Sequence, residues 1–285
     1  MLVIVGFLIV AVCVVTGFIL AGGNLLVLLQ WSEFIIIGGA ALGSFLIGSP
    51  MEVVKKVIKA IPGTMKSHSF SKQDYLEMLK AFNDLFLVAQ RDGLLSIESH
   101  VEKPEESTIL SKSSKLMHSE HMRNFFCDTM KVMLSGGIPP HELDMLIDME
   151  IETFEAEQKP VGHAINKIGD ALPGLGIVAA VLGIIVTMGS INDGAEAVGH
   201  HVAAALVGTF LGVLLAYGFI GPLASNIEHS TEESIQHLIT IKTCIVAYAK
   251  GNPPIMAVEM ARRTIFSDSR PTFSELENYM RGKSE

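Results

Sequence analysis

The sequence predicts an all-α, polytopic membrane protein with four transmembrane helices and a helical cytoplasmic domain. Hydrophobic residues make up 49% of the chain, and the mean hydropathy of +0.43 is high for a water-soluble domain. All 21 Lys and Arg residues lie in two blocks, Lys55 to Lys167 and Lys242 to Lys283. A Lys or Arg at the bilayer centre costs about 2.5–3.5 kcal/mol, so the four apolar runs outside these blocks are expected to span the membrane.

The same charge pattern predicts the topology. Loops rich in Lys and Arg stay on the cytoplasmic side, so the segments without them, Gly22–Ser32 and Ser190–Gly199, are expected outside. Both termini are then cytoplasmic. The apolar start of the chain has no basic residue ahead of it, which favours a retained span over a cleaved signal peptide. The predicted organisation is 1–50 for transmembrane helices 1 and 2, 51–170 for the cytoplasmic helical domain, 171–224 for transmembrane helices 3 and 4, and 225–285 for a cytoplasmic C-terminal tail.

The first two spans differ in length and composition. Leu2–Ala21 is uncharged and has the roughly 20 residues that a 30 Å hydrocarbon core requires. Glu33–Ile47 is shorter, and its Gly39 and Gly43 lie four residues apart, a spacing that lets helix backbones approach closely. Trp31 stands where an interfacial aromatic anchor is expected.

The long insertion between spans two and three is predicted to be helical. Apolar residues recur at three- and four-residue spacing between Ser71, a predicted N-cap, and Gly93, a predicted stop. A loop is expected from Pro104 to Ser114, and a second helix is expected over the sequence HMRNFFCDTMKVMLSGG. Pro139–Pro140 is predicted to start a third, acidic helix.

The third and fourth spans are predicted at Ala171–Met188 and His201–Leu223. Both are rich in Gly and Ala, and Gly208 and Gly212 lie four residues apart, so these helices are suited to dense packing more than to facing lipid. The tail that follows is polar and predicted to be helical.

Composition and motifs narrow the function. The net charge of -9 argues against nucleic-acid binding and fits either a docking surface for a charged protein or ordinary solvation. The sequence contains no GxSxG, Walker, HExxH or CxxC motif, so neither an enzyme nor a cofactor is expected. His118 and His121 could pair on one helix face, but no third ligand follows at a metal-site spacing, so no metal is expected.

Spans three and four contain no Asp, Glu, Lys or Arg. Ion translocation usually requires an ionisable group within the membrane. Either the protein moves no ions, or a partner supplies the acid. Thr209 and Tyr217 are polar residues that could surround such a partner, although a lone helical threonine more often bonds its own backbone.

The motifs GDALPGLGIVAAVLGIIVTMG, VGTFLGVLLAYGFIGPLA and RPTFSELE closely resemble the MotA family of flagellar-motor stator subunits, relatives of TolQ and ExbB. GLLSIE and DMEIE add to the resemblance, which covers nearly the whole chain. It implies a multi-pass protein of the bacterial inner membrane, with five copies assembled around two copies of MotB. The MotB span carries the ion-binding Asp, and ion flow through the complex drives the rotor protein FliG.

The resemblance also assigns residues. It places Pro173 and Pro222 at positions that couple ion flow to movement, and Thr209 and Tyr217 in the motif of the ring's inner helix. The residues that it assigns to the rotor contact are Arg91, Glu98 and Glu150. When the motif is aligned on Gly93 and Glu98, Gln90 takes the family's arginine position and Arg91 stands beside it.

Two further expectations concern the ion and the competing functions. VGTFLG and AYGFIGP resemble the proton-using branch more than the sodium-using branch, so the translocated ion is expected to be H+.

The alternative function is that of a TolQ/ExbB-like energiser of an envelope transport or tethering system. Four spans with both termini inside, together with the MotA-type tail, argue against that alternative. A membrane scaffold without ion flux would explain the packed helices but not their prolines.

Overall fold

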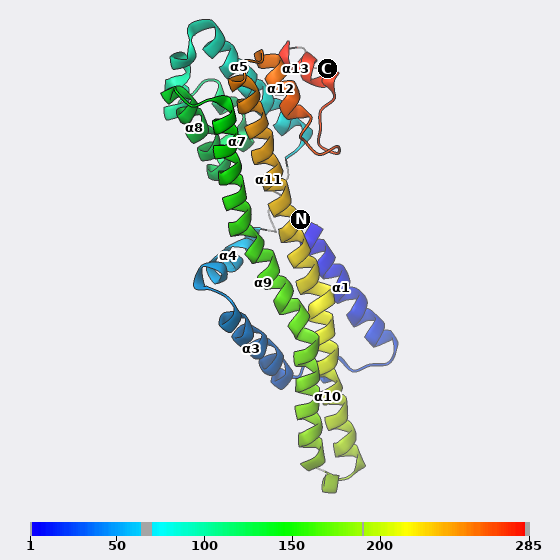
Figure 1. The fold of residues 1–285 in the computed structure, drawn as a ribbon. Helices are drawn as coiled ribbons and strands as arrows, with labels where there is room; N and C mark the ends of the chain where they lie inside the picture. The colour runs from blue at the N-terminus through cyan, green and yellow to red at the C-terminus, as the bar shows by residue number, and fades with distance from the viewer. Residues whose placement is uncertain (1, 64–69, 190, 283–285) are drawn as a thin grey trace. The chain divides into compact units, whose positions relative to one another are not determined.

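The computed structural model describes residues 2–63, 70–189 and 191–282, and every regular element in these ranges is a helix (Figure 1). The all-α prediction is therefore confirmed. The chain forms two compact units, one of Met1–Ser67 with Gln158–Ser230 and the other of His68–Glu157 with Thr231–Glu285. We call them the membrane unit and the insertion unit. The predicted domain limits were drawn at the expected membrane surface, whereas this division follows contacts within the chain.

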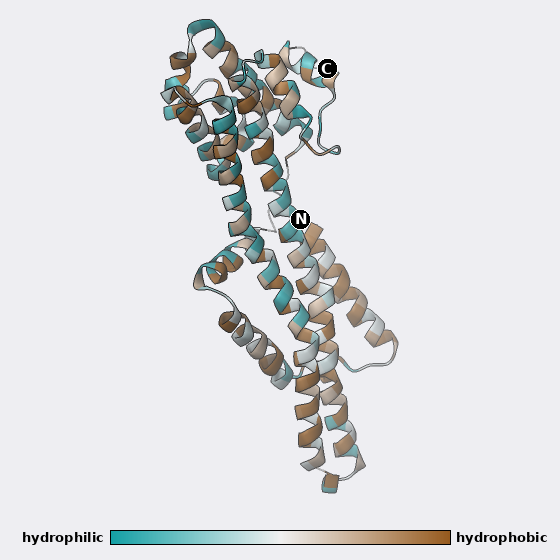
Figure 2. Cartoon of the chain, in the orientation of Figure 1, coloured by the Kyte–Doolittle hydropathy of each residue, from teal (hydrophilic) through white to brown (hydrophobic). Residues whose placement is uncertain are grey.

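The membrane unit contains the four predicted spans as helices, which are the apolar segments in Figure 2. The candidate spans are Leu2–Leu20, Leu25–Gly48, Pro140–Gly189 and Ala195–Ala249. The elements are α1 (Leu2–Leu20), α2 (Leu25–Leu28), α3 (Trp31–Gly48), α4 (Met51–Gly63), η3 (Ile191–Asp193), α10 (Ala195–Leu214), the π-helix η4 (Leu215–Ile220), the second part of α9 (Pro140–Gly189) and the first part of α11 (Gly221–Ala249). In the predicted outer segment between the third and fourth spans, Ser190 lies outside the described residues.

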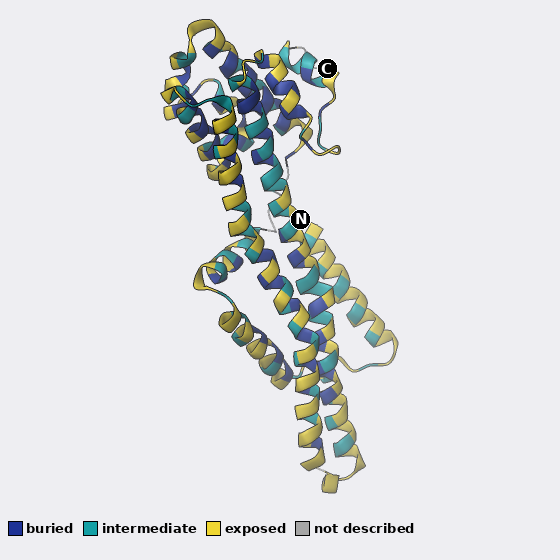
Figure 3. Cartoon of the chain, viewed as in Figure 1, coloured by how far each residue is buried: buried dark blue, intermediate teal, exposed yellow. Residues whose placement is uncertain are grey.

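Helix α1 has no buried residue, although it is the most apolar of the four spans (Figure 3). Leu8 and Ile9 are 59% and 57% exposed. An apolar surface of this size is typical of contact with lipid or with another membrane helix. Its contact with the rest of the unit includes Phe7, whose ring centroid lies 5.2 Å from that of Phe219 in η4.

Helix α9 is one continuous helix of 50 residues. The sequence predicted two helices here, an acidic one after Pro140 and a separate span at Ala171–Met188. Pro160 and Pro173 lie inside the helix. A proline removes one backbone hydrogen bond and crowds the carbonyl four residues earlier. Neither proline ends α9, although both lie inside it.

The insertion unit consists of shorter helices around a separate core. Its elements are α5 (Lys72–Asp92), η1 (Leu94–Ile97), α6 (Glu98–Glu102), η2 (Leu110–Lys112), α7 (Ser114–His118), α8 (Glu120–Ser135), α12 (Pro254–Arg262), α13 (Phe273–Met280), the first part of α9 and the second part of α11. The predicted limits of α5 are confirmed. Ser71 and Asp74 form a reciprocal capping box, and Gly93 ends the helix with φ +90°.

Large side chains fill the core of the insertion unit. The rings of Phe82 and Phe126 stack with centroids 4.5 Å apart, and those of Phe86 and Tyr248 stack at 4.2 Å. Ion pairs join α9 to α11 at the edge of this core, where Lys242 Nζ lies 2.7 Å from Asp144 Oδ1.

A buried ion pair holds the tail of the chain. Arg262 donates two 2.7 Å hydrogen bonds to the Glu259 carboxylate and one of 2.8 Å to the carbonyl of Pro271. The bonds from Arg262 to the carboxylate hold the pKa of Glu259 below its usual range. The pair fixes the segment between α12 and α13 to the unit.

Candidate functional sites

Glycines bring α9 and α10 into backbone contact. A Cβ built on Gly176 would lie 2.7 Å from the carbonyl oxygen of Gly208 and 3.1 Å from Cα of Gly212. Neither distance leaves room for a side chain. The two helices therefore touch through their backbones, as small-residue motifs allow in membranes.

The same contact continues along both helices. A Cβ on Gly212 would lie 2.5 Å from the carbonyl oxygen of Leu172, and a Cβ on Gly183 would lie 2.7 Å from Cβ of Ala205. We call this line of contacts the glycine seam. The small residues that the sequence marked for dense packing are thus used between two helices of one chain.

Thr209 and Pro173 lie beside the glycine seam. Cα of Thr209 is 3.3 Å from the position of a Cβ on Gly176, and its side chain is half-buried. Pro173 is also half-buried and follows Leu172 of the seam. Tyr217 is 72% exposed and Pro222 is exposed, so these two side chains face away from the α9–α10 contact.

The helix changes form immediately before Pro222. Residues Leu215–Ile220 form a π-helix, and the N–H of Gly221 bonds the carbonyl of Ala216 five residues earlier. An α-helix would offer the carbonyl of Gly218 to the N–H that Pro222 lacks. The wider turn accommodates this proline, and π-turns are frequently found at functional sites. Tyr217 lies within the turn, whereas α9 passes Pro173 as an α-helix.

Glu33 is a buried carboxylate that the sequence placed only at the edge of a span. It lies in the first turn of α3 and is 5% exposed. Its Oε2 atom lies against Gly208 of α10, where a Cβ would collide with it. The sequence signal was an acid at the start of an apolar helix, but sequence alone could not show that its side chain points inward.

Arg91 and its neighbours form the exposed end of α5. The Arg91 side chain is 76% exposed, and its Nη2 atom lies 2.7 Å from Oδ2 of Asp92. The hydrogen bonds raise the pKa of Arg91 and lower that of Asp92. The positive charge of Arg91 is therefore partly neutralised within the chain. Gln90 is exposed beside it.

Glu98 and Glu150 are both exposed on the insertion unit. Glu98 starts α6, four residues after Leu94 opens η1, while Glu150 lies on α9. The structure therefore places the predicted acids and Arg91 on the surface of one unit, on three different helices.

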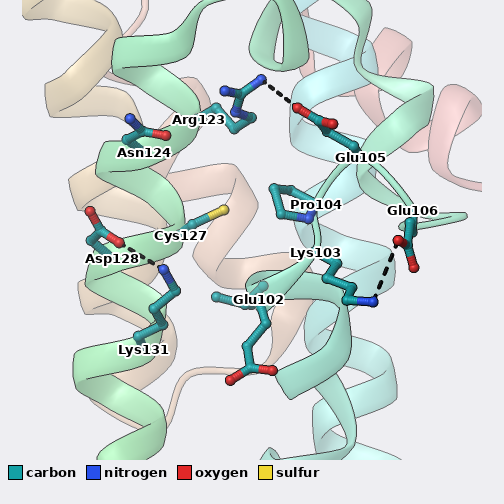
Figure 4. Close-up of a pocket in the computed structure, with 11 residues that line it drawn as sticks. Glu102, Lys103, Pro104, Glu105, Glu106, Arg123, Asn124, Cys127, Asp128 and Lys131 are labelled. Carbon is teal, nitrogen blue, oxygen red and sulfur yellow. Dashed lines mark hydrogen bonds and ion pairs between the residues drawn. The ribbon is translucent and has the colours of Figure 1, made fainter.

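A mixed-charge pocket of about 360 Å³ lies between the segment after α6 and helix α8 (Figure 4). Arg123, Cys127 and Lys131 line it from α8 at four-residue spacing, which places them on one helix face. Burial raises the pKa of the Cys127 thiol to about 11, so this cysteine is not a nucleophile at neutral pH. Sequence reasoning did not single out this pocket, although the four-residue spacing was visible.

Acids surround the cations of the pocket. Arg123 Nη1 lies 3.4 Å from Glu105 Oε1, and Lys131 Nζ lies 2.9 Å from Asp128 Oδ1. The Lys131–Asp128 pair is largely exposed and contributes little to stability, while in the other pair Glu105 is exposed and Arg123 is half-buried.

The histidines considered as metal ligands have other contacts. His118 Nδ1 lies 2.7 Å from the carbonyl oxygen of Ser114, and the His121 ring stacks on Phe154 at 4.2 Å. Within the described ranges, no group of three or more His, Cys, Asp or Glu side chains is arranged to hold a metal ion.

Comparison with known proteins identifies two family regions. Residues 4–93 match the motility protein A N-terminal region, and residues 117–239 match the MotA/TolQ/ExbB proton channel family. The chain is 36% identical over 281 residues to motility protein A of Salmonella typhimurium, covering 99% of this chain and 95% of that protein.

Two solved structures share the fold. The chain superposes on the C. jejuni MotAB structure with a TM-score of 0.80 at 21% identity, covering 95% of this chain and 98% of that one. The flagellar MotAB stator complex from Bacillus subtilis gives 0.74 at 19% identity, covering 90% and 92%. With its near-complete coverage by relatives, this multi-pass membrane protein belongs to the motility protein A family, within the MotA/TolQ/ExbB proton channel family.

Proposed function

We propose that the chain is a stator subunit of the bacterial flagellar motor that, with a MotB-type partner, conducts protons and converts their flow into torque. The 36% identity to motility protein A, which extends over 99% of this chain, carries this proposal. The match over residues 4–93 to the motility-specific N-terminal region favours it over a TolQ/ExbB-like energiser.

The partner supplies what the third and fourth spans lack. No acid or base occurs between Ala171 and Met188 or between His201 and Leu223, so the proton carrier must come largely from elsewhere. Apolar side chains on the outer face of α9 support a neighbour there, since Ile177, Val181 and Ile185 are 56%, 50% and 62% exposed. We propose five copies of the chain around two MotB-type subunits.

Thr209 and Pro173 beside the glycine seam, together with Tyr217 and Pro222 at the π-helix, form the proposed coupling site. Thr209 offers a hydroxyl to a proton or its water on the partner side of α10. Pro173 and Pro222 each leave one carbonyl without its helical N–H, and such carbonyls at membrane depth require a protein or water partner. The π-turn that contains Tyr217 adds a second, wider hydrogen-bonding pattern. Movement of a proton past these groups would favour one helix geometry over another.

The insertion unit provides the rotor contact. We propose that Glu98 and Glu150 meet the rotor protein FliG through charged contacts, with Arg91 as the cation. The ion pair with Asp92 weakens the contact that Arg91 can make with the rotor, since an exposed guanidinium that is already paired gains little from a second carboxylate.

A motility experiment tests the proposed function. The chain is expressed with its MotB-type partner in cells that lack stators, and rotation is measured while the proton and sodium gradients are collapsed separately. Rotation should return and should stop when the proton gradient is collapsed. Failure of rotation with both proteins in the membrane would contradict the proposal, and rotation that follows sodium would contradict the choice of ion.

Alanine variants test the coupling site. Pro173→Ala and Pro222→Ala should leave the complex assembled while the torque per stator falls sharply. Pro160→Ala is the matched control, because it also lies inside α9 but before the apolar part of that helix. Normal torque in both coupling variants would mean that the prolines only shape helices.

Thiol labelling tests the proposed location in the inner membrane with both termini in the cytoplasm. Asn24→Cys and Ala195→Cys should react with an impermeant reagent in whole cells, whereas Ser111→Cys should not. All three positions are exposed in the structure, so a lack of labelling at Ser111→Cys would show that the membrane blocks the reagent, and not that the side chain is buried in the protein. The native cysteines are replaced by alanine beforehand. Labelling of Ser111→Cys would overturn the topology.

A further inference from the structure

Glu33 lies deep in the packing of the membrane unit. Its carboxylate meets α10 at Gly208, about 20 Å along that helix from its first residue at 1.5 Å per residue. The side chain is 5% exposed, and Oε2 has no hydrogen-bond partner among the residues that the structure describes. An unpartnered carboxylate oxygen at such a position is costly in either protonation state.

The surroundings of this carboxylate are apolar. The atoms near the Gly208 site are Cβ of Ala179 and the backbone of Ala180, at 3.1 and 3.2 Å from a Cβ on that glycine. Helix α2, which also packs on α10, has the sequence LLVL. On α10, the titratable side chain that shares the face of Gly208 is His201, two turns toward the start of the helix. No described residue thus neutralises Glu33 by direct contact.

The chain is not helical immediately before α3. Leu29 has φ −88° and ψ 73°, and Gln30 is extended with no side-chain cap bond to α3. The Gln30 amide instead donates to the carbonyl of Val27 at 3.1 Å. Non-helical backbone near membrane depth is tolerated where it lines water or is buried in protein. Trp31 is 77% exposed, as expected of an anchor at the membrane interface. Water from that side can thus approach the first turn of α3.

We propose that Glu33 is a proton-binding carboxyl of this chain, which takes up protons from the outer side of the membrane and passes them toward the conducting path. The inference rests on the proposed function as a proton-driven stator. An O–H bond forms at Oε2 when a hydronium ion on the outer side donates a proton and becomes water. The same bond breaks when the proton passes to the next acceptor, so no other reactant is consumed.

A purely structural role explains less. Glutamine has almost the same shape and would leave no charge to bury, and leucine would fill the same space without a polar atom. A carboxyl beside Gly208 is the choice that can bind and release a proton. The glycine is itself required by the carboxylate, because a Cβ on Gly208 would occupy its place.

The test uses the full complex in motors turning at low load. Glu33→Gln is compared with wild type over a series of external pH values at constant internal pH. Glu196→Gln is the matched control, since Glu196 is an exposed acid in the first turn of α10. Glu33→Gln should assemble normally, turn more slowly at low load, and lose the dependence of speed on external pH. Glu33→Asp should regain that dependence in part.

Wild-type speed and wild-type pH dependence in Glu33→Gln would overturn the proposal. If that variant does not assemble, infrared spectra of the wild-type complex with isotope-labelled glutamate decide. A protonated-carboxyl band that responds to pH and is shifted in Glu33→Asp supports the proposal, and an invariant band overturns it. A failure of the wild-type chain to drive rotation in stator-less cells would instead contradict the proposed function.

Discussion

The membrane unit and the insertion unit are both all-helical, but they pack in opposite ways. In the membrane unit, α9 and α10 meet through Gly176, Gly208 and Gly212, with backbone against backbone. In the insertion unit, stacked aromatic pairs such as Phe82 and Phe126 fill the core. Lipid tails are as apolar as leucine, so helices in a membrane gain most from close approach. In water, the burial of large apolar side chains stabilises the fold through the hydrophobic effect.

The largest effect is expected at the glycine seam. Gly176→Leu should abolish most of the assembled complex, because the new side chain would collide with the carbonyl of Gly208. Gly174→Leu should be tolerated, since a Cβ there meets no atom within 4 Å. The yield of complex purified from membranes measures both. Equal yields would mean that the seam does not hold the helices together.

The insertion unit should instead respond to loss of volume. Phe82→Ala removes a fully buried ring and should lower the free energy of unfolding of this unit by about 3–5 kcal/mol. Leu95→Ala should change it by less than about 0.5 kcal/mol, because Leu95 is 71% exposed. Thermal unfolding of the detergent-solubilised protein provides the comparison. Similar losses in both variants would show that this core is loosely packed.

A smaller loss is expected from the buried ion pair of the tail. Glu259→Gln leaves Arg262, whose side chain is 11% exposed, without a carboxylate and should lower the free energy of unfolding by about 3 kcal/mol. Glu277→Gln is the control, because its pair with Arg281 is largely exposed and should contribute about 0–1 kcal/mol. The same unfolding measurement applies, and equal effects would show that Arg262 finds water when its partner is removed.

The smallest effect concerns pH. The Thr272 backbone N–H, the Thr272 hydroxyl and Lys72 together lower the pKa of Glu275 to about 2. Because this folded-state pKa lies below the usual 4.5, the carboxylate stabilises the fold fully above about pH 4.5. That contribution is lost as the pH falls toward 2. The difference in melting temperature between wild type and Glu275→Gln should therefore shrink over this range, and a constant difference would contradict the assignment.

Sequence predicted the fold well where one signal dominates. Charge segregation marked all four spans, and Ser71 with Gly93 marked the ends of α5. It failed at α9, where an acidic helix and a separate span were predicted and the structure has one helix of 50 residues. Local patterns could not show that the two segments form one helix, because the change from acidic to apolar composition falls within it.

The sequence likewise predicted some residues of the candidate sites and missed others. The resemblance named Pro173, Thr209, Tyr217 and Pro222, and the structure adds that η4, which contains Tyr217 and precedes Pro222, is a π-helix. Glu33 could be read from the sequence only as an acid near a span. The direction in which the Glu33 side chain points depends on where α3 packs against α10, and no pattern within α3 determines that.

The π-helix has a further consequence for how mutations in this span should be interpreted. Its five-residue bond between Gly221 and Ala216 accommodates one residue more than an α-turn would. Deleting one residue from Leu215–Ile220 would therefore restore an α-turn and leave the later side chains of α11 close to their present angular positions. The same deletion within the regular part of α11 would turn every later side chain by about 100° around the helix axis. A single deletion in the π-helix thus acts as a local change in hydrogen bonding, whereas a deletion further along the chain acts as a rotation of α11.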